Sequence, residues 1–135
     1  MLIQTNSSLD ILSYTKDERF VELTNVGTGI FNELILEFLT ELSKSLLNDA
    51  EVKKHPEIVS FAFFCRQANL KKLRNKFTRS EDLRFGRGVV FHITPGNVPL
   101  NFAYSLLSAM LAGNSSIVRV PTKQFEEVDI LISRI

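Results

Sequence analysis

Apolar side chains recur at intervals of three and four residues over two stretches in the first half of the chain. The second stretch begins near Pro56, which the first turn of a helix accepts because its missing N–H needs no partner there, and it continues toward Leu73. This spacing predicts two amphipathic helices. The first stretch begins at Ile30, and its apolar positions are Phe31, Leu34, Ile35, Phe38, Leu39, Leu42 and Leu46.

The pattern changes in the second half of the chain. Residues 89–93 and 116–120 are short apolar runs rich in β-branched side chains, which is typical of strands in a parallel sheet. Residues 100–111 have helical spacing, Gly113 follows where a glycine commonly ends a helix, and residues 125–135 start another helix. This order is that of a βαβ unit with right-handed crossovers, so we predict an α/β fold.

These changes divide the chain into three predicted parts. Residues 1–28 are a mixed segment with a possible short strand over 19–24, and residues 29–80 are helical. Residues 81–135 form the first βαβ part of an α/β domain. The last predicted helix runs to the end of the chain, and a two-stranded parallel sheet has both edges unpaired. We therefore expect an amino-terminal piece of a longer protein.

Composition narrows the class of protein. The 135 residues are 44% hydrophobic and 23% charged, as in one ordinary soluble domain. The single cysteine excludes a disulfide framework and agrees with a reducing compartment, and no secretory signal is visible. The longest uncharged run, residues 98–117, is interrupted by polar side chains and is a poor membrane span. We expect a cytoplasmic protein, and the net charge of +1 gives no reason to expect nucleic acid.

Two compositional features have alternative interpretations. The 11 phenylalanines favour a bulky aromatic core over a stripe that stacks on nucleic-acid bases. Residues 66–79 carry six cations and no acid, which fits either a solvated helix face or a patch that binds an anion such as a polyphosphate.

The candidate chemistry lies where the two predicted strands end, because ligands of open α/β sheets bind beyond the carboxyl ends of strands. Residues 94–99 read Thr-Pro-Gly-Asn-Val-Pro and lead into a helix, an arrangement suited to a developing negative oxygen or a phosphate. Arg119 and Lys123 flank the second turn and could hold an anionic cofactor group. In adjacent parallel strands these two turns lie side by side.

Other patterns lead to no chemistry. The pair Gly86 and Gly88 lacks a third glycine and precedes its strand, so it is no dinucleotide fingerprint. We interpret His92 as a hydrogen-bonded structural residue and Cys65 as a small buried hydrophobe. His55 has no partner at a metal-ligand spacing, so no metal site is predicted.

Residues 88–99, 111–114 and 117–123 resemble the LuxC family of acyl-CoA (fatty acyl) reductases, a branch of the aldehyde dehydrogenase superfamily. Residues 64–72 also resemble the basic helix of that family. The wider superfamily usually has Pro-Trp-Asn-Phe-Pro where this chain has Pro-Gly-Asn-Val-Pro, which points to this branch. The resemblance implies the start of a parallel-sheet, Rossmann-like cofactor domain of the aldehyde dehydrogenase fold, preceded by two amphipathic helices.

The same resemblance assigns roles to individual residues. Asn97 matches the asparagine whose amide helps form the oxyanion hole, and Ile93 and Thr94 match the backbone that lines the nicotinamide. Arg119 stands where a lysine commonly contacts the adenosine ribose, and Thr122 where NAD-preferring members often have a glutamate. Losing that carboxylate while gaining Arg119 and Lys123 favours a 2′-phosphate, so the expected cofactor is NADPH.

The implied activity is the conversion of a fatty acyl-CoA or acyl-protein thioester to an aldehyde through a cysteine thioester. The catalytic cysteine and glutamate of the family would lie beyond Ile135, so this chain alone is expected to be inactive. The family also implies a homo-oligomer at full length, acyltransferase and acyl-protein synthetase partners, and bioluminescence as one destination of the aldehyde. The alternative is a stand-alone nucleotide- or partner-binding module without acyl chemistry.

Overall fold

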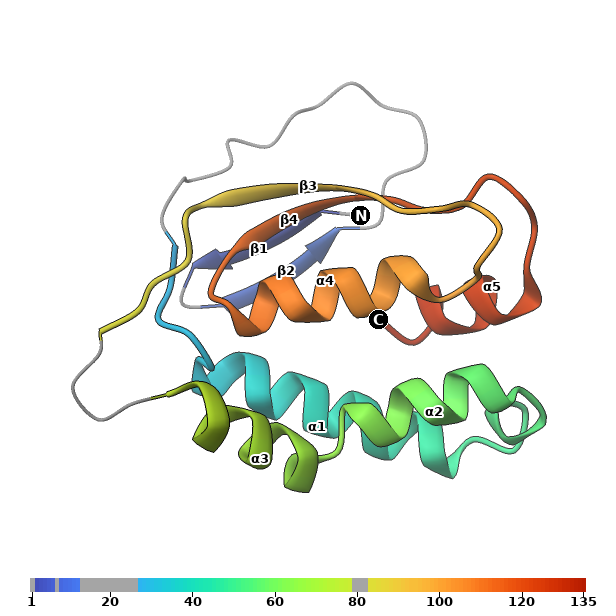
Figure 1. Ribbon diagram of the computed structural model, residues 1–135. Helices are drawn as coiled ribbons and strands as arrows, with labels where there is room; N and C mark the ends of the chain where they lie inside the picture. Colours follow the sequence, from blue (N-terminus) through green and yellow to red (C-terminus); the bar gives the residue numbers. More distant parts are fainter. Residues whose placement is uncertain (1, 7, 13–26, 79–82) are drawn as a thin grey trace.

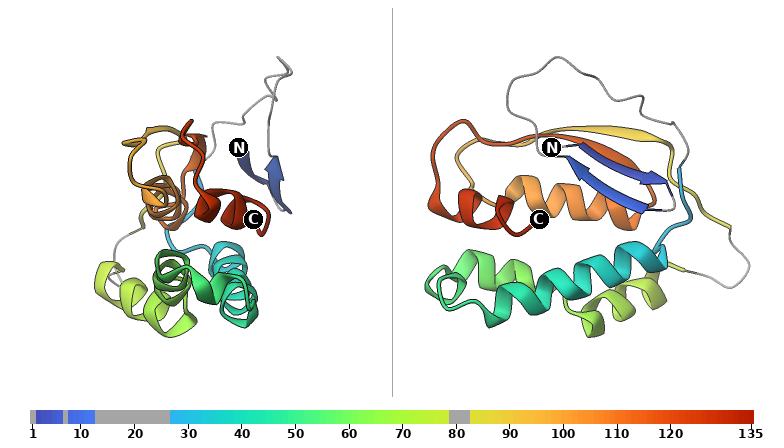
Figure 2. Two further views of the ribbon diagram at one scale, coloured as in Figure 1. Left: turned by 90° about the vertical axis from the view of Figure 1, so that its right-hand side faces the viewer. Right: turned by 180° about the vertical axis from the view of Figure 1, so that it is seen from behind.

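The computed structural model describes residues 2–6, 8–12, 27–78 and 83–135, which form three layers (Figure 1). A sheet forms one outer layer, two helices pack against one of its faces, and three further helices form the other outer layer. Both views in Figure 2 show the same order of layers. The middle layer contains α4 (Asn101–Leu111) and α5 (Glu126–Ile132), and the outer helical layer contains α1 (Glu33–Asn48), α2 (Pro56–Phe64) and α3 (Gln67–Phe77).

The sheet has four strands in the order β2-β1-β4-β3. Strands β3 and β4 are parallel and joined by α4, which confirms a mixed helix-and-sheet fold with the predicted parallel pair. The prediction of two strands with unpaired edges is wrong, because β1 pairs antiparallel with β4 and with β2. The predicted strand over residues 19–24 lies outside the described residues. The strands are β1 (Leu2–Asn6), β2 (Ser8–Leu12), β3 (Val89–Ile93) and β4 (Ser115–Arg119).

The helical part of the chain differs from the prediction at one break. The single helix expected from Pro56 onward ends at Phe64, and a new helix starts at Gln67. Arg66 adopts an extended conformation between them, with φ −62° and ψ 140°. The side-chain amide of Asn69 donates to the Phe64 carbonyl at 2.7 Å. This carbonyl lies at the end of α2, where the break removes its partner within the helix. The break lets α3 bury Leu70, which is 1% exposed.

The last helix is also shorter than predicted, since α5 ends at Ile132 instead of continuing to Ile135. The guanidinium of Arg134 turns back to the end of α1 and donates from Nε and Nη2 to Asp49 Oδ2, at 3.1 and 2.6 Å. This hydrogen bond lowers the pKa of Asp49. The contact ties the middle layer to the outer helical layer.

The core lies between the helical layers and under the sheet. The prediction of an aromatic core is correct for Phe31, Phe61 and Phe102, which are all buried. It is wrong for Phe63 and Phe77, each 49% exposed. Phe63 lies outside the buried face of α2, and Phe77 is the last residue of α3. Inside the core, the hydroxyl of Ser43 donates to the carbonyl of Ala62 at 2.7 Å and joins α1 to α2.

Close glycine contacts hold the amino end of the parallel strands. The N–H of Thr28 donates to the Gly113 carbonyl and the N–H of Gly86 donates to the Thr28 carbonyl, both at 2.9 Å. A Cβ on Gly113 would lie 2.2 Å from the Thr28 oxygen, and one on Gly86 would lie 1.9 Å from the Gly113 oxygen. Gly86, which belongs to no dinucleotide fingerprint, therefore serves close backbone packing.

Within the described part of the chain, no helix has both the length and the apolar character needed to cross a membrane.

Candidate cofactor and oxyanion site

The carboxyl ends of β3 and β4 lie side by side, as the sequence predicts. Ile93 pairs with Arg119 in the parallel register, so the two strands end together. The chain leaves β3 into residues 94–100, which carry Asn97, and leaves β4 into the segment with Thr122 and Lys123. Figure 1 shows both connections at the same end of the sheet, on the right, above the starts of α4 and α5. The fold therefore gathers the predicted site residues at one edge.

The first connection can stabilise negative charge. Helix α4 has 11 residues and no side-chain hydrogen bond at its N-cap, Leu100, so the positive end of its dipole has no side-chain acceptor. The N–H groups of Asn101 and Ala103 donate to the carbonyls of Val98 and Leu100. Asn97 is exposed just before this helix. A Cβ on Gly96 would meet nothing within 4 Å, which leaves the space beside Asn97 open. An amide and a helix N-terminus around open space are the elements of an oxyanion site.

Thr94 adds an unsatisfied polar atom to the same edge. Among the described residues, its Oγ1 is the buried side-chain oxygen that has no hydrogen-bond partner. Leaving a buried hydroxyl without a partner costs about 1–3 kcal/mol, so a ligand or an ordered water that reaches this atom is favoured. The family resemblance implied a role for the backbone of Thr94, whereas only the structure shows that its hydroxyl lacks a hydrogen-bond partner.

The second connection carries uncompensated positive charge. Arg119 and Lys123 are exposed, and neither forms an ion pair with another residue that the structure describes. The Nζ of Lys123 lies 4.9 Å from the centroid of the Phe125 ring, a cation–π contact that orients the side chain. Thr122 is exposed and adds no charge. This segment can therefore hold an anionic group such as a phosphate.

His92 supports this edge from inside the fold. Its side chain is 6% exposed, and its Nδ1 and Nε2 lie 2.8 Å from Ser105 Oγ and 3.1 Å from Ser116 Oγ. Burial lowers the pKa of His92, which favours the neutral ring. The predicted structural role is confirmed, because the imidazole joins β3 to both α4 and β4.

Cys65 lies in the outer helical layer and is fully buried. Burial raises the pKa of its thiol to about 12, so the nucleophilic thiolate is strongly disfavoured. The interpretation of Cys65 as a small buried hydrophobe is confirmed.

An apolar groove, which the sequence did not reveal, runs beside the carboxyl-terminal half of α4. The cavity has a volume of about 460 Å³ and lies between α4, α2, α3 and the segment before α1. The signal in the sequence that could have indicated this groove was the number of phenylalanines in α2 and α3, because the core does not bury all of them. The lining includes Phe31, Phe64, Leu73, Phe77, Leu111 and Ala112.

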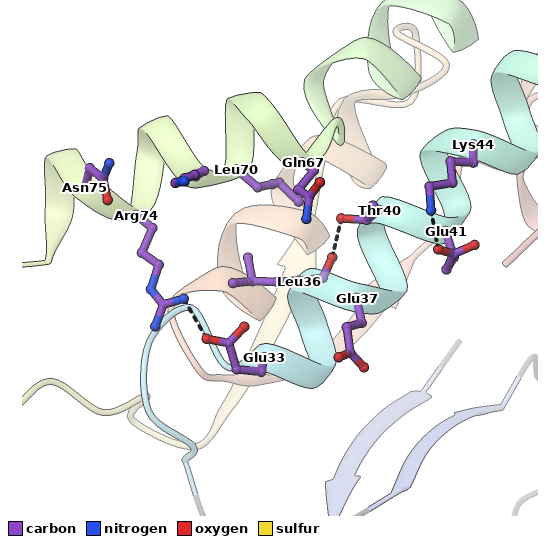
Figure 3. A pocket seen from close by; sticks show the side chains of 11 residues that line it. Glu33, Leu36, Glu37, Thr40, Glu41, Lys44, Gln67, Leu70, Arg74 and Asn75 are labelled. Atoms are coloured by element: carbon purple, nitrogen blue, oxygen red, sulfur yellow. Dashed lines mark hydrogen bonds and ion pairs between the residues drawn. The ribbon is translucent and has the colours of Figure 1, made fainter.

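A second groove, of about 470 Å³, lies between α1 and α3 and is polar (Figure 3). Arg74, from the basic stretch, donates to Glu33 at 2.6 Å, and Glu37 and Glu41 line the same groove. Of the other cations, Arg66 lies over the ring of Phe63 at 5.2 Å. The negative charges of these glutamates would repel a polyphosphate from this groove. For the described part of residues 66–79, the structure therefore favours the solvated helix face over the anion-binding patch.

Comparison with known proteins completes this description. The sequence profile of the family described as acyl-CoA reductase (LuxC) matches residues 57–130, which run from α2 into α5 and include both connections. No curated protein and no solved structure matches the chain. Because the profile covers more than half of the 135 residues, the chain belongs to the LuxC family of acyl-CoA reductases.

Proposed function

We propose that this chain supplies the oxyanion site and part of the cofactor site of an NADPH-dependent acyl-CoA reductase, with the aldehyde dehydrogenase fold. The complete enzyme would convert fatty acyl thioesters to aldehydes through a cysteine thioester. The observation that carries the proposal is the pairing of Ile93 with Arg119, because it puts the Asn97 connection and the cationic segment at one edge.

The role of Asn97 follows from the charge that develops in the reaction. When a thiolate adds to a thioester carbonyl, the carbonyl oxygen becomes anionic. The amide N–H of Asn97 can donate to that oxygen, and the positive end of the α4 dipole lies close to it. Removing one such donor from an oxyanion site typically lowers turnover by about 10²–10³-fold.

When bound, NADPH would supply the hydride that releases the aldehyde. In our proposal, Arg119 and Lys123 bind its 2′-phosphate, because both are exposed cations without a carboxylate partner among the described residues. The residues present fit the cofactor in a second respect, since the unsatisfied hydroxyl of Thr94 lies at the same edge.

The apolar groove is the proposed place for the acyl chain. Along α4 the groove begins at Leu107, about 9 Å from the first residue of the helix, Asn101, a distance that a long acyl chain can cover. The groove is lined almost entirely by apolar side chains, which suits a hydrocarbon.

The cofactor assignment is tested by titrating the purified chain with NADPH and with NADH and following the nucleotide fluorescence. We expect NADPH to bind at least about tenfold more tightly, since a charge-assisted contact contributes about 1.5–3 kcal/mol. Arg119→Gln and Lys123→Gln should weaken NADPH binding and leave NADH nearly unchanged. Lys71→Gln, which removes an exposed cation of α3, is the matched control. Equal affinities of the unmodified chain for the two nucleotides would refute the assignment.

The burial of Cys65 favours a second candidate function, that of a stand-alone nucleotide-binding module. The only cysteine of the sequence is buried and its thiol pKa is about 12, so this chain should not oxidise NADPH when acyl-CoA is added. Nucleotide binding without any acyl-CoA binding would favour a stand-alone nucleotide-binding module. Acyl-CoA-dependent oxidation of NADPH by the purified chain would show that the expected inactivity is wrong.

A further inference from the structure

Three potential metal ligands from two layers of the fold converge outside the site described above. Glu51 and His55 flank the short helix η1 (Val52–Lys54), and Glu126 is the first residue of α5. A ring nitrogen of His55 and one carboxylate oxygen from each glutamate all lie within 4.8 Å of one another. We propose that these three residues bind a divalent transition-metal ion, with Zn²⁺ as the preferred ion.

The orientation of His55 supports this proposal. Its side chain is only 13% exposed, and the two ring nitrogens face different carboxylates. Nε2 lies 4.0 Å from Glu126 Oε2, and Nδ1 lies 3.6 Å from Glu127 Oε1. A metal-binding histidine almost always donates its second ring N–H to a carboxylate or carbonyl, which fixes the ring and raises its basicity. The Glu127 oxygen, at 3.6 Å, needs only a small side-chain movement to accept that N–H.

The donor set selects the kind of ion. Zinc accepts both imidazole nitrogen and carboxylate oxygen as ligands, and many zinc sites have three protein ligands with water as the fourth, whereas Mg²⁺ and Ca²⁺ prefer oxygen ligands throughout. Two ligands of one zinc ion are at most about 4 Å apart. The Glu51 and Glu126 side chains are 47% and 70% exposed, so both can move the short remaining distance.

One cation competes for the site. The Nζ of Lys54 lies 2.7 Å from Glu51 Oε2 and so pairs with a carboxylate that the ion would use. Metal binding must therefore displace or share this contact. It follows that removing the Lys54 charge should raise the affinity for the ion.

Binding is tested on the purified chain without an affinity tag, by competition with a chromophoric zinc chelator. We expect one Zn²⁺ per chain. His55→Ala and Glu51→Gln should each weaken binding by at least about tenfold, Glu127→Gln should weaken it about tenfold, and Lys54→Gln should tighten it. The Co²⁺-loaded protein should show visible absorption without a thiolate band, because Cys65 is buried.

Glu41→Gln is the matched control, since Glu41 and Lys44 form the same i,i+3 pair at 2.7 Å as Glu51 and Lys54. Circular dichroism checks that each variant folds, and the exposed Glu51 gives a variant that leaves the core intact. The proposal is overturned if Zn²⁺ does not bind, if Glu51→Gln binds it unchanged, or if Glu41→Gln weakens it equally.

Discussion

Two glycines of this chain have opposite requirements, although both lie in turns. Gly113 has φ +77° and its Cβ position is 2.2 Å from a backbone oxygen, whereas a Cβ on Gly96 meets nothing within 4 Å. Gly113 is thus needed for its backbone conformation and for close packing. Gly96 is needed for neither, and its lack of a side chain leaves space beside Asn97.

We predict that Gly113→Ala lowers the free energy of unfolding by about 2 kcal/mol or more, because the strain and the clash add. Gly96→Ala should change it by less than about 1 kcal/mol, with stabilisation as the expected sign, since alanine restricts the unfolded chain. Urea denaturation of both variants measures the difference. A Gly113→Ala protein as stable as the unmodified chain would contradict the glycine contacts described above.

At the scale of elements, the imidazole of one residue, His92, joins β3 to β4 and to α4. His92 lies between Ser105 of α4 and Ser116 of β4, and protonation of the ring would place a charge in this buried position. The pKa of His92 is lowered in the folded protein, so the unfolded chain takes up the proton first as the pH falls.

The stability from His92 is therefore complete above the ordinary pKa of 6.5 and is lost as the pH falls below it. We predict that the free energy of unfolding falls between pH 7.5 and pH 5.5, by at most about 1.4 kcal/mol per pH unit from this residue. His92→Gln should lower stability at pH 7.5 and flatten this dependence. Denaturation at both pH values gives the comparison, and an equal pH dependence in the variant would exclude His92 as the cause.

At the scale of the whole molecule, the packing of the two helical layers creates the apolar groove, because its walls come from helices of the middle and the outer layer. The contact of Arg134 with Asp49 joins the two helical layers, and the hydrogen bond from Ser43 to Ala62 joins α1 to α2 within the outer layer. A hydrocarbon chain bound there would contact both helical layers at once.

We predict that Ala112→Trp, at the edge of the groove, weakens binding of a fluorescent fatty-acid probe about tenfold or more by filling the space. Ala68→Trp is the matched control, because Ala68 is exposed on α3 and does not line the groove. Titration of the probe into both variants provides the measurement. Equal weakening by both substitutions would place the acyl chain elsewhere.

The sequence by itself determined the features that depend on neighbouring residues. The period of three and four residues predicts α1 and α4, the β-branched runs predict β3 and β4, and the residues after each strand indicate the candidate site. Local chain geometry is enough for these features, since side-chain periodicity and turn residues act within a few positions.

Only the tertiary structure decided the features that join distant parts of the chain. They include the pairing of β1 with β4, the break before α3, the exposed phenylalanines, and the meeting of His55 with Glu126. Sequence spacing does not encode these contacts, because burial and pairing depend on which surfaces the folded layers bring together. The sequence pattern therefore predicted α1, α4, β3 and β4, whereas packing decided the groove and the metal-ligand cluster.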